Sequence, residues 1–156
     1  MSSILRPILC TLICLFIGGG SGFLTVDSIS KWYVDINKPF FNPPNWIFGP
    51  VWTTLYTIMG FSAGVIWNMG WNSPGVKKAL GVFSVHMLLN GLWSVLFFGL
   101  KNPEIAFIEI LILLGSIAYY TRLFYALKPV TAWLQVPYLA WVSFASVLNG
   151  SIAWLN

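Results

Sequence analysis

Long apolar runs separated by short polar breaks make up most of this chain. The apolar runs lie at about residues 4–26, 46–69, 76–100, 104–126 and 130–155. Each run has about the 20 residues that an α-helix needs to cross the hydrocarbon core of a bilayer. Charges, prolines and glycines, which end helices, fill the breaks. The pattern predicts an all-α, five-helix transmembrane bundle in a single domain covering residues 1–156.

The break at residues 27–45 is the only one long enough to have a shape of its own. It holds four charged residues and three prolines, and its aromatic residues are Trp32, Tyr33, Phe40 and Phe41. Amphipathic rings favour the interface between membrane and water. We therefore expect a structured loop at the membrane surface between the first two helices.

Local signals predict how several helices begin, end and bend. Asn45 is a candidate N-cap for the second helix, and Gly70 is expected to end it. Ser73 is the capping candidate for the third helix. Pro137 lies inside the last apolar run, where it removes a backbone hydrogen bond and is expected to bend the helix.

The glycines of the first apolar run allow two readings. Gly18 and Gly22 have the spacing that lets two membrane helices approach closely. Arg6, the apolar stretch and the small residues after it also fit a cleaved signal peptide. The apolar character continues beyond the glycines to Val26, which favours a retained helix.

Composition supports a membrane protein. Hydrophobic residues make up 58% of the chain and charged residues 8%, whereas an ordinary soluble domain carries about 25% charge. The formal net charge is +4, but Lys77-Lys78 is the only basic pair in the sequence, which argues against nucleic acid. Five cations would lie on one side of the membrane and three on the other. The positive-inside rule then places the N-terminus in the cytoplasm.

Polar and aromatic residues share helical faces in three of the predicted spans. Their spacings of three and four residues put each set on one side of its helix: His86, Asn90, Trp93 and Phe97; Tyr138, Trp141, Ala145 and Asn149; Trp52, Tyr56 and Met59. An apolar cavity with a few placed polar groups is typical of a small-molecule site. The alternative is that these faces only pack helices together.

The usual signatures of an enzyme are absent from the sequence. It has no G-x-S-x-G nucleophile elbow and no phosphate-binding loop in a strand-to-helix setting. His86, Cys10 and Cys14 supply too few ligands for a metal site, so we predict none. Chemistry carried by a bound pigment would need none of these signatures.

Three segments resemble the TspO/MBR family, which comprises the tryptophan-rich sensory proteins and the mitochondrial translocator protein, or peripheral benzodiazepine receptor. The segments are WYVDINKPFFNPPNWIFGPVWTTLY at 32–56, LLNGLWSVLFFG at 88–99 and PYLAWVSFASVLN at 137–149. The resemblance implies a five-helix bundle, often a homodimer, with a pocket under the first loop. It also implies binding of tetrapyrroles such as protoporphyrin IX and haem-pathway intermediates. Mitochondrial members bind sterol and benzodiazepine- or isoquinoline-type drugs.

The resemblance carries over a set of pocket residues. They are Tyr33, Pro43, Trp46, Trp52, Asn90, Trp93, Ser94, Trp141 and Ala145. Trp46 and Phe40 occupy loop positions linked to porphyrin handling and are the only candidates for a catalytic role. Some bacterial members have Trp at the position of Phe40. Lys31 and Lys38 are candidates to attract the propionates of a porphyrin.

The favoured hypothesis is a membrane receptor or sensor that holds a tetrapyrrole-like ligand and requires no cofactor. The alternatives are an enzyme that degrades protoporphyrin with light and oxygen, and a porphyrin or sterol transporter. The C-terminus lacks the Tyr and Arg of the proposed mitochondrial cholesterol motif. This absence indicates a bacterial member, located in the cell membrane as a multi-pass protein, and lowers the expectation of specific sterol recognition.

Overall fold

The computed structural model describes residues 3–156, except for the side chain of Leu24. This part of the chain is helical and contains no strand. The α-helices are α1 (Leu5–Ser30), α2 (Trp32–Asp35), α3 (Phe48–Asn68), α4 (Val76–Ser94), α5 (Pro103–Leu127), α6 (Pro129–Trp133) and α7 (Val136–Leu155). A 3₁₀ turn, η1 (Asn45–Ile47), precedes α3, and a π-helical segment, η2 (Val95–Gly99), continues α4.

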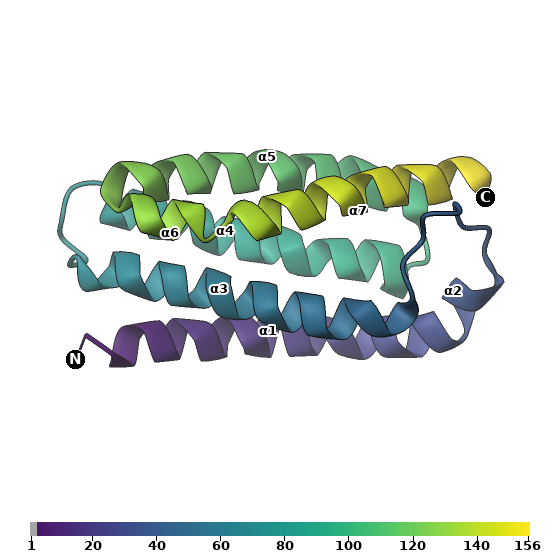
Figure 1. Cartoon of the computed structure of the whole chain (residues 1–156), viewed down its shortest axis with the longest axis horizontal. Helices are drawn as coiled ribbons and strands as arrows, with labels where there is room; N and C mark the ends of the chain where they lie inside the picture. Colours follow the sequence, from purple (N-terminus) through teal and green to yellow (C-terminus); the bar gives the residue numbers. More distant parts are fainter. Residues whose placement is uncertain (1–2) are drawn as a thin grey trace.

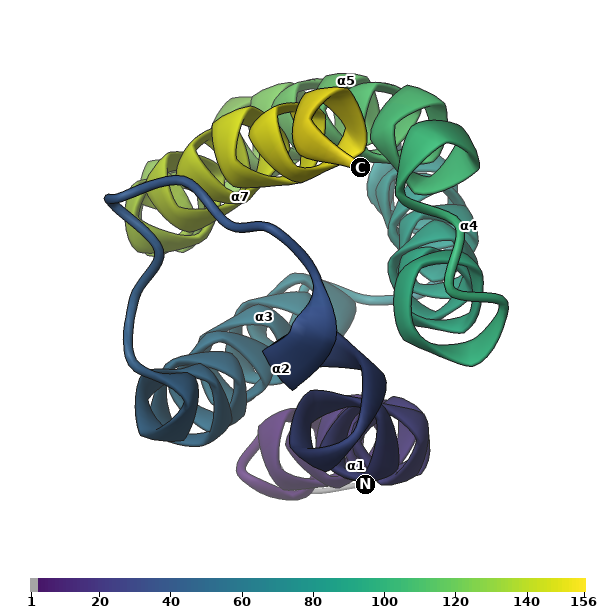
Figure 2. The same ribbon diagram turned by 90° about the vertical axis from the view of Figure 1, so that its right-hand side faces the viewer.

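The long helices run side by side, and the two ends of the chain lie at opposite ends of the bundle (Figure 1). Seen along the bundle, α4, α5 and α7 form an arc that faces α1 and α3 (Figure 2). The segment between α2 and α3 crosses one end of the bundle. We call this the loop end and the opposite end the N-terminal end.

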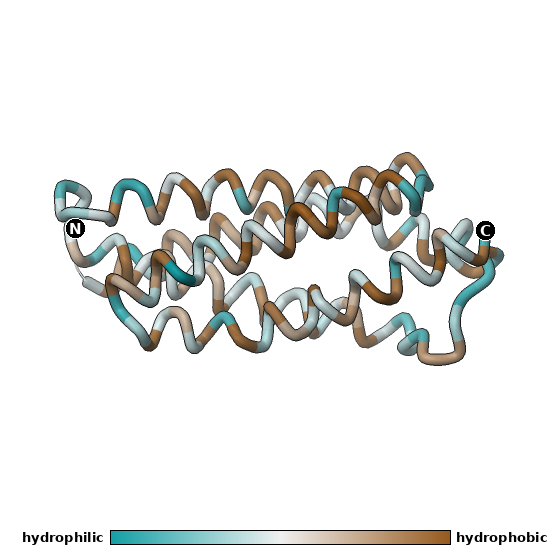
Figure 3. The backbone as a smooth tube through the Cα atoms, turned by 90° about the horizontal axis from the view of Figure 1, so that it is seen from above, coloured by the Kyte–Doolittle hydropathy of each residue, from teal (hydrophilic) through white to brown (hydrophobic). Residues whose placement is uncertain are grey.

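Four helical segments of the described chain are long and apolar enough to cross a membrane. They are Leu5–Ser30, Val76–Gly99, Pro103–Leu127 and Pro129–Leu155. The fifth predicted span, α3, has 21 residues and is not among these four. Apolar residues recur along the long helices (Figure 3). Many of the large apolar side chains are exposed. The protein is therefore a multi-pass integral membrane protein.

Several predicted helix ends differ from the structure. α1 continues to Ser30, so Asp27 lies in the helix, where it forms a 2.6 Å ion pair with Lys31 one turn later. Asn45 and Ser73 are not N-caps: α3 begins without a side-chain cap, and Gly75 precedes α4 with a φ of +83°. The last apolar run is broken rather than bent, because α6 ends before Pro137 and α7 starts beside it.

The closest helix approach lies between α1 and α3. A Cβ placed on Gly60 or Gly64 would overlap the backbone of Thr11 or Pro7. These two glycines have the spacing that was expected to matter at Gly18 and Gly22. A Cβ on Gly22 would meet open space, so the prediction of close packing at Gly22 is wrong.

The π-helical segment η2 is tied to α1. In η2 the amide of Leu100 donates to the carbonyl of Val95, five residues earlier, at 2.7 Å. The hydroxyl of the buried Ser28 donates to the carbonyl of Phe98 at 2.6 Å. A serine from α1 thus satisfies a carbonyl of the widened turn, and π-helical turns occur frequently at functional sites.

Candidate ligand-binding site

The main candidate site lies between α1 and α3, near the loop end. This α1–α3 cavity has a volume of about 630 Å³, within the range of about 300–1,000 Å³ that small-molecule sites occupy. It is lined by Leu15, Gly18, Gly19, Ser21, Gly22, Thr25, Val26, Ile29 and Ser30 of α1, by Asn45, Trp46, Phe48, Gly49, Trp52, Thr53 and Tyr56 of the η1–α3 segment, and by Trp93, Ser94 and Phe98.

The cavity lies toward the loop end of the α1–α3 pair, and the two backbones are in contact toward the N-terminal end. Gly60 and Gly64 bring the helices into backbone contact toward the N-terminal end. Toward the loop end, Gly19 and Gly22 of α1 have no neighbouring atoms within 4 Å of a Cβ position. Glycines of α3 thus allow the two backbones to touch, whereas glycines of α1 leave space beside the cavity.

A second, much smaller cavity lies beside the first, under the loop. It has a volume of about 20 Å³ and is lined by Tyr33, Phe48, Trp52, Trp93, Phe97, Phe98, Trp141, Ala145, Leu148, Asn149 and Ile152. Four of these residues, Phe48, Trp52, Trp93 and Phe98, also line the α1–α3 cavity. Their rings form the partition between the two cavities.

The structure divides the residues that were predicted to line one pocket. Trp46, Trp52, Trp93 and Ser94 line the α1–α3 cavity. Tyr33, Trp141 and Ala145 line the small cavity.

Three predicted residues lie elsewhere. Pro43 borders an outer groove that it shares with Trp141. Phe40 is completely exposed and lies on another groove, beside Trp154. Asn90 is 2% exposed and lines neither cavity.

Stacked and edge-on aromatic rings build the partition. The ring centroids of Trp93 and Phe97 lie 5.3 Å apart with nearly parallel planes. Those of Trp52 and Trp93 lie 6.4 Å apart at 30°. The indole N–H of Trp93 donates to the side-chain carbonyl of Asn149 at 3.0 Å. Offset and edge-on contacts of this kind favour a well-packed wall over a loose one.

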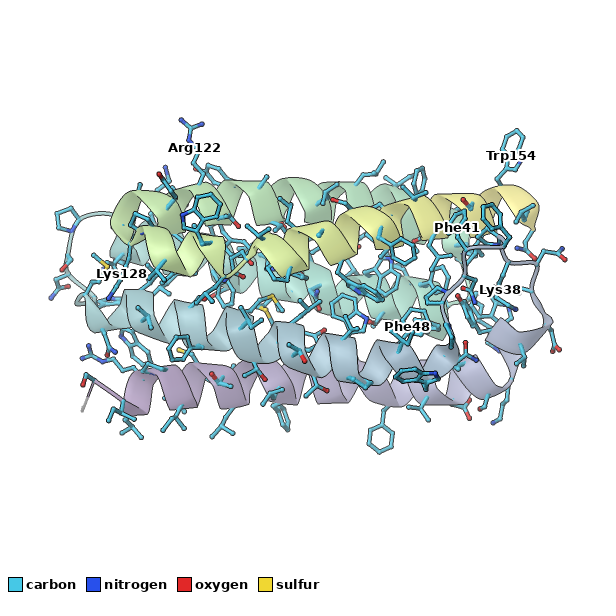
Figure 4. All side chains as sticks on the ribbon, viewed as in Figure 1. Lys38, Phe41, Phe48, Arg122, Lys128 and Trp154 are labelled. Carbon is cyan, nitrogen blue, oxygen red and sulfur yellow. The ribbon has the colours of Figure 1, made fainter. Side chains whose placement is uncertain are left out.

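The loop is held over the bundle by Tyr33 and Lys38. The Tyr33 hydroxyl donates to the side-chain carbonyl of Asn42 at 2.6 Å, and its burial raises the pKa of Tyr33 to about 12. The Lys38 ammonium donates to the carbonyls of Tyr33 and Ile36 at 2.6 and 2.8 Å. Lys38 lies at the loop end (Figure 4), where it closes the end of α2 rather than facing a cavity.

A buried chain of hydrogen bonds begins at the wall of the α1–α3 cavity. The Tyr56 hydroxyl donates to the side-chain carbonyl of Asn90. The amide of Asn90 bonds to the Tyr138 oxygen at 2.7 Å, and Tyr138 lies 3.0 Å from Nε2 of His86. Nδ1 of His86 lies 2.8 Å from the Ser116 hydroxyl. The chain joins α3, α4, α7 and α5, and both groups of the Asn90 amide are occupied within it.

One protein family matches nearly the whole chain. The sequence model of the TspO/MBR family matches residues 10–155. The chain belongs to the TspO/MBR family.

Curated relatives of the chain cover most of its length. The tryptophan-rich protein TspO of Archaeoglobus fulgidus is 42% identical over 156 residues, 99% of each chain. The human translocator protein is 35% identical over 131 residues, 83% of this chain and 77% of its own. The tryptophan-rich sensory protein of Cereibacter sphaeroides is 32% identical over 126 residues, 81% of this chain and 77% of its own.

Sequence reasoning missed a second buried network in this TspO/MBR chain. The Tyr120 hydroxyl donates to the side-chain carbonyl of Gln135 at 2.8 Å, and the Gln135 amide donates to the Ser62 hydroxyl at 2.9 Å. Gln135 is fully buried in the break between α6 and α7. A glutamine in an apolar run two residues before a proline was the available signal, because a freed backbone near proline needs polar partners.

Proposed function

We propose that this TspO/MBR protein is a membrane receptor or sensor that binds a flat hydrophobic ligand of the tetrapyrrole class in the α1–α3 cavity. The single observation that carries the proposal is the cavity itself, with about 630 Å³ between helices and three tryptophans in its wall. Flat aromatic ligands gain affinity by stacking and edge contacts with such rings. Protoporphyrin IX and haem-pathway intermediates are the expected ligands, and no cofactor is needed to bind them.

The two cavities suggest how the remaining predicted residues take part. A ligand that displaces the rings of Trp52 and Trp93 would join the α1–α3 cavity to the small cavity. Tyr33, Trp141 and Ala145 would then contact the ligand from the far side of the partition. Sterols and benzodiazepine- or isoquinoline-type drugs are further hydrophobic ligands that we propose for these cavities. The mammalian relatives are named translocator protein, which leaves transport of such a ligand as an alternative function.

Quenching of tryptophan fluorescence by protoporphyrin IX in the dark tests the proposal. Gly22 lines the cavity and Gly20 does not, although both lie on α1 with open space around a Cβ position. Gly22→Leu is expected to weaken saturable quenching by about tenfold or more, since it fills the cavity. Gly20→Leu, the matched control, is expected to retain the affinity of the unaltered protein.

Two results would contradict this placement. Equal affinity in Gly22→Leu and Gly20→Leu would exclude the α1–α3 cavity. Loss of binding in Ala145→Leu, together with full affinity in Gly22→Leu, would place the ligand in an enlarged small cavity instead. No saturable quenching in the unaltered protein would exclude protoporphyrin IX as a ligand.

A light-dependent enzyme is the second candidate function. The observation that favours it is the tryptophan pair Trp52 and Trp93, 6.4 Å apart in the cavity wall, with the exposed Trp46 beside them. Under light and oxygen, a protein-dependent change in porphyrin absorbance that is lost in Trp46→Phe would support degradation. Identical bleaching of free pigment in detergent would exclude it.

We also propose five membrane spans, with the N-terminus in the cytoplasm, and a homodimer. Arg6 and Lys128 lie at the N-terminal end of the bundle, whereas Asp27 and Asp35 lie at the loop end. Lysine and arginine are favoured on the cytoplasmic side. Labelling of single cysteines placed at the two ends, and crosslinking in the membrane, test the orientation and the dimer separately.

A further inference from the structure

Three hydroxyl groups in the wall of the α1–α3 cavity donate their protons to their own helices. Ser21, Thr25 and Thr53 each donate to the backbone carbonyl four residues earlier, at 3.0, 3.1 and 2.9 Å. A hydroxyl group has one proton to donate and two lone pairs that accept. Toward a ligand, these three groups therefore offer lone pairs rather than protons.

Among the hydroxyl groups in the cavity wall, that of Tyr56 has the least freedom to point its proton in another direction. Its ring lies against Gly18, where a Cβ would come within 2.9 Å of the ring carbon that carries the hydroxyl. The hydroxyl proton goes to the side-chain carbonyl of Asn90. A carbonyl oxygen can only accept a hydrogen bond. Tyr56 therefore donates to Asn90 only while the Asn90 side chain turns its carbonyl, and not its NH2 group, toward Tyr56.

The far end of the buried chain determines the direction of every bond in it. The Ser116 hydroxyl donates to the carbonyl of Leu113 at 2.6 Å, so its oxygen must accept from the Nδ1–H of His86. Nε2 of the neutral ring then carries no proton and accepts from Tyr138. The Tyr138 oxygen accepts from the Asn90 amide in turn.

This order leaves the Asn90 carbonyl facing Tyr56. In this order each of the five polar side chains has a partner. Turning the Asn90 amide alone would set its carbonyl against the Tyr138 oxygen with no proton between them, which is costly in a low-dielectric interior. The Tyr56 proton is thereby held inward, away from the cavity.

We infer that Tyr56 is a specificity-determining residue whose oxygen accepts a hydrogen bond from an N–H or O–H group of the ligand. The inference rests on the proposed function, namely that the α1–α3 cavity holds the ligand. The ligand class is a flat apolar molecule with a donor on its inward edge, such as a pyrrole, indole or lactam N–H. Trp46 and Trp52 line the same cavity nearer the loop.

Carbazole and dibenzofuran form a probe pair for this inference. They have nearly the same shape, but carbazole carries an N–H where dibenzofuran carries an ether oxygen. Dissociation constants are measured by fluorescence in one detergent for the unaltered protein and for Tyr56→Phe. Loss of one neutral hydrogen bond is expected to weaken carbazole about fivefold to tenfold, while dibenzofuran changes by less than about twofold.

Two further variants separate this role from a general effect on structure. Thr57→Val is the matched control, because Thr57 neighbours Tyr56 but bonds to Thr53 on the exposed face of α3. It is expected to leave both constants unchanged. Tyr138→Phe leaves the cavity wall intact but frees the Asn90 amide to turn. Carbazole is then expected to bind more weakly and dibenzofuran more tightly, since the Tyr56 proton can point into the cavity.

The outcomes distinguish the inference from the proposed function. If both compounds bind the unaltered protein and Tyr56→Phe weakens them equally or not at all, the inference is wrong and the cavity remains a binding site. If neither compound shows saturable binding, the α1–α3 cavity is not a site for flat aromatic ligands, and the inference fails with the proposed function.

Discussion

Gly64 of α3 lies against Pro7 of α1 so closely that a Cβ on Gly64 would overlap the proline backbone. Gly64→Ala must therefore push the two helices apart, because backbone cannot move aside as a flexible side chain can. We expect it to lower the free energy of unfolding by about 1–3 kcal/mol, the usual effect of overpacking. Unfolding by SDS titration in mixed micelles measures the change.

Gly81→Ala is the control for this prediction. Gly81 lies on the exposed face of α4, where a Cβ meets open space. Alanine also favours a helix over glycine by about 1 kcal/mol, so we expect unchanged or slightly higher stability. Equal stability of Gly64→Ala and Gly81→Ala would contradict the close approach of α1 and α3.

Gln135→Leu tests the network at the break between α6 and α7. The substitution removes the partners of the Tyr120 and Ser62 hydroxyls, both of which are buried. We expect a loss of about 1–3 kcal/mol in unfolding free energy from the unpaired groups. Ser143→Ala on the exposed face of α7 removes only a bond to its own helix and should change nothing measurable. A stable Gln135→Leu protein would show that the network is not required.

Ser28→Ala tests the link between α1 and the π-helical segment. The variant leaves the Phe98 carbonyl without its 2.6 Å donor, and one interhelical hydrogen bond in a membrane protein contributes about 1 kcal/mol. Because Phe98 lines the α1–α3 cavity, ligand affinity should fall along with stability. Ser84→Ala, whose hydroxyl bonds only to α4 itself and lines neither cavity, should retain both, and equal behaviour of the two variants would argue against the link.

The loop contact of Tyr33 predicts sensitivity to alkali. Burial raises the pKa of Tyr33 to about 12, whereas an unfolded tyrosine titrates near about 10. The protonated hydroxyl is the donor to Asn42, so its contribution to stability is complete below about pH 10 and is lost as the pH rises toward about 12.

Tyr33→Phe isolates this contribution. The variant should be less stable at neutral pH by about 0.5–1.5 kcal/mol, the contribution of one hydrogen bond. Its melting temperature should also decline less between pH 9 and about 11.5 than that of the unaltered protein, as differential scanning calorimetry in detergent would detect. Parallel declines in the two proteins would exclude Tyr33 as the titrating group.

Sequence periodicity correctly predicted which helical faces turn inward. His86, Asn90, Trp93 and Phe97 all lie in the interior, as their spacing of four, three and four residues requires. On α3, Tyr56 and Met59 of the predicted face are buried, whereas Thr53 next to Trp52 is exposed. The helical repeat predicts which residues lie on the same side of a helix, but it does not predict how many neighbouring positions on that side are buried.

The identity of contacting partners could not be predicted in the same way. Gly18–Gly22 and Gly60–Gly64 have the same spacing, yet only the second pair meets another backbone along its length. Asn90 was expected to face a ligand, but in the structure its amide is fully occupied by Tyr56 and Tyr138. These outcomes depend on which helix lies opposite, and local sequence carries no record of that.

By itself the sequence determined the membrane environment, the helical class and the family, because apolar length, low charge and the loop motif are properties of the chain read in order. Only the tertiary structure decided where the room for a ligand lies. That space lies between two helices that touch at Gly60 and Gly64 and leave a cavity nearer the loop. Such a cavity depends on the relative position of the helices rather than on any single segment.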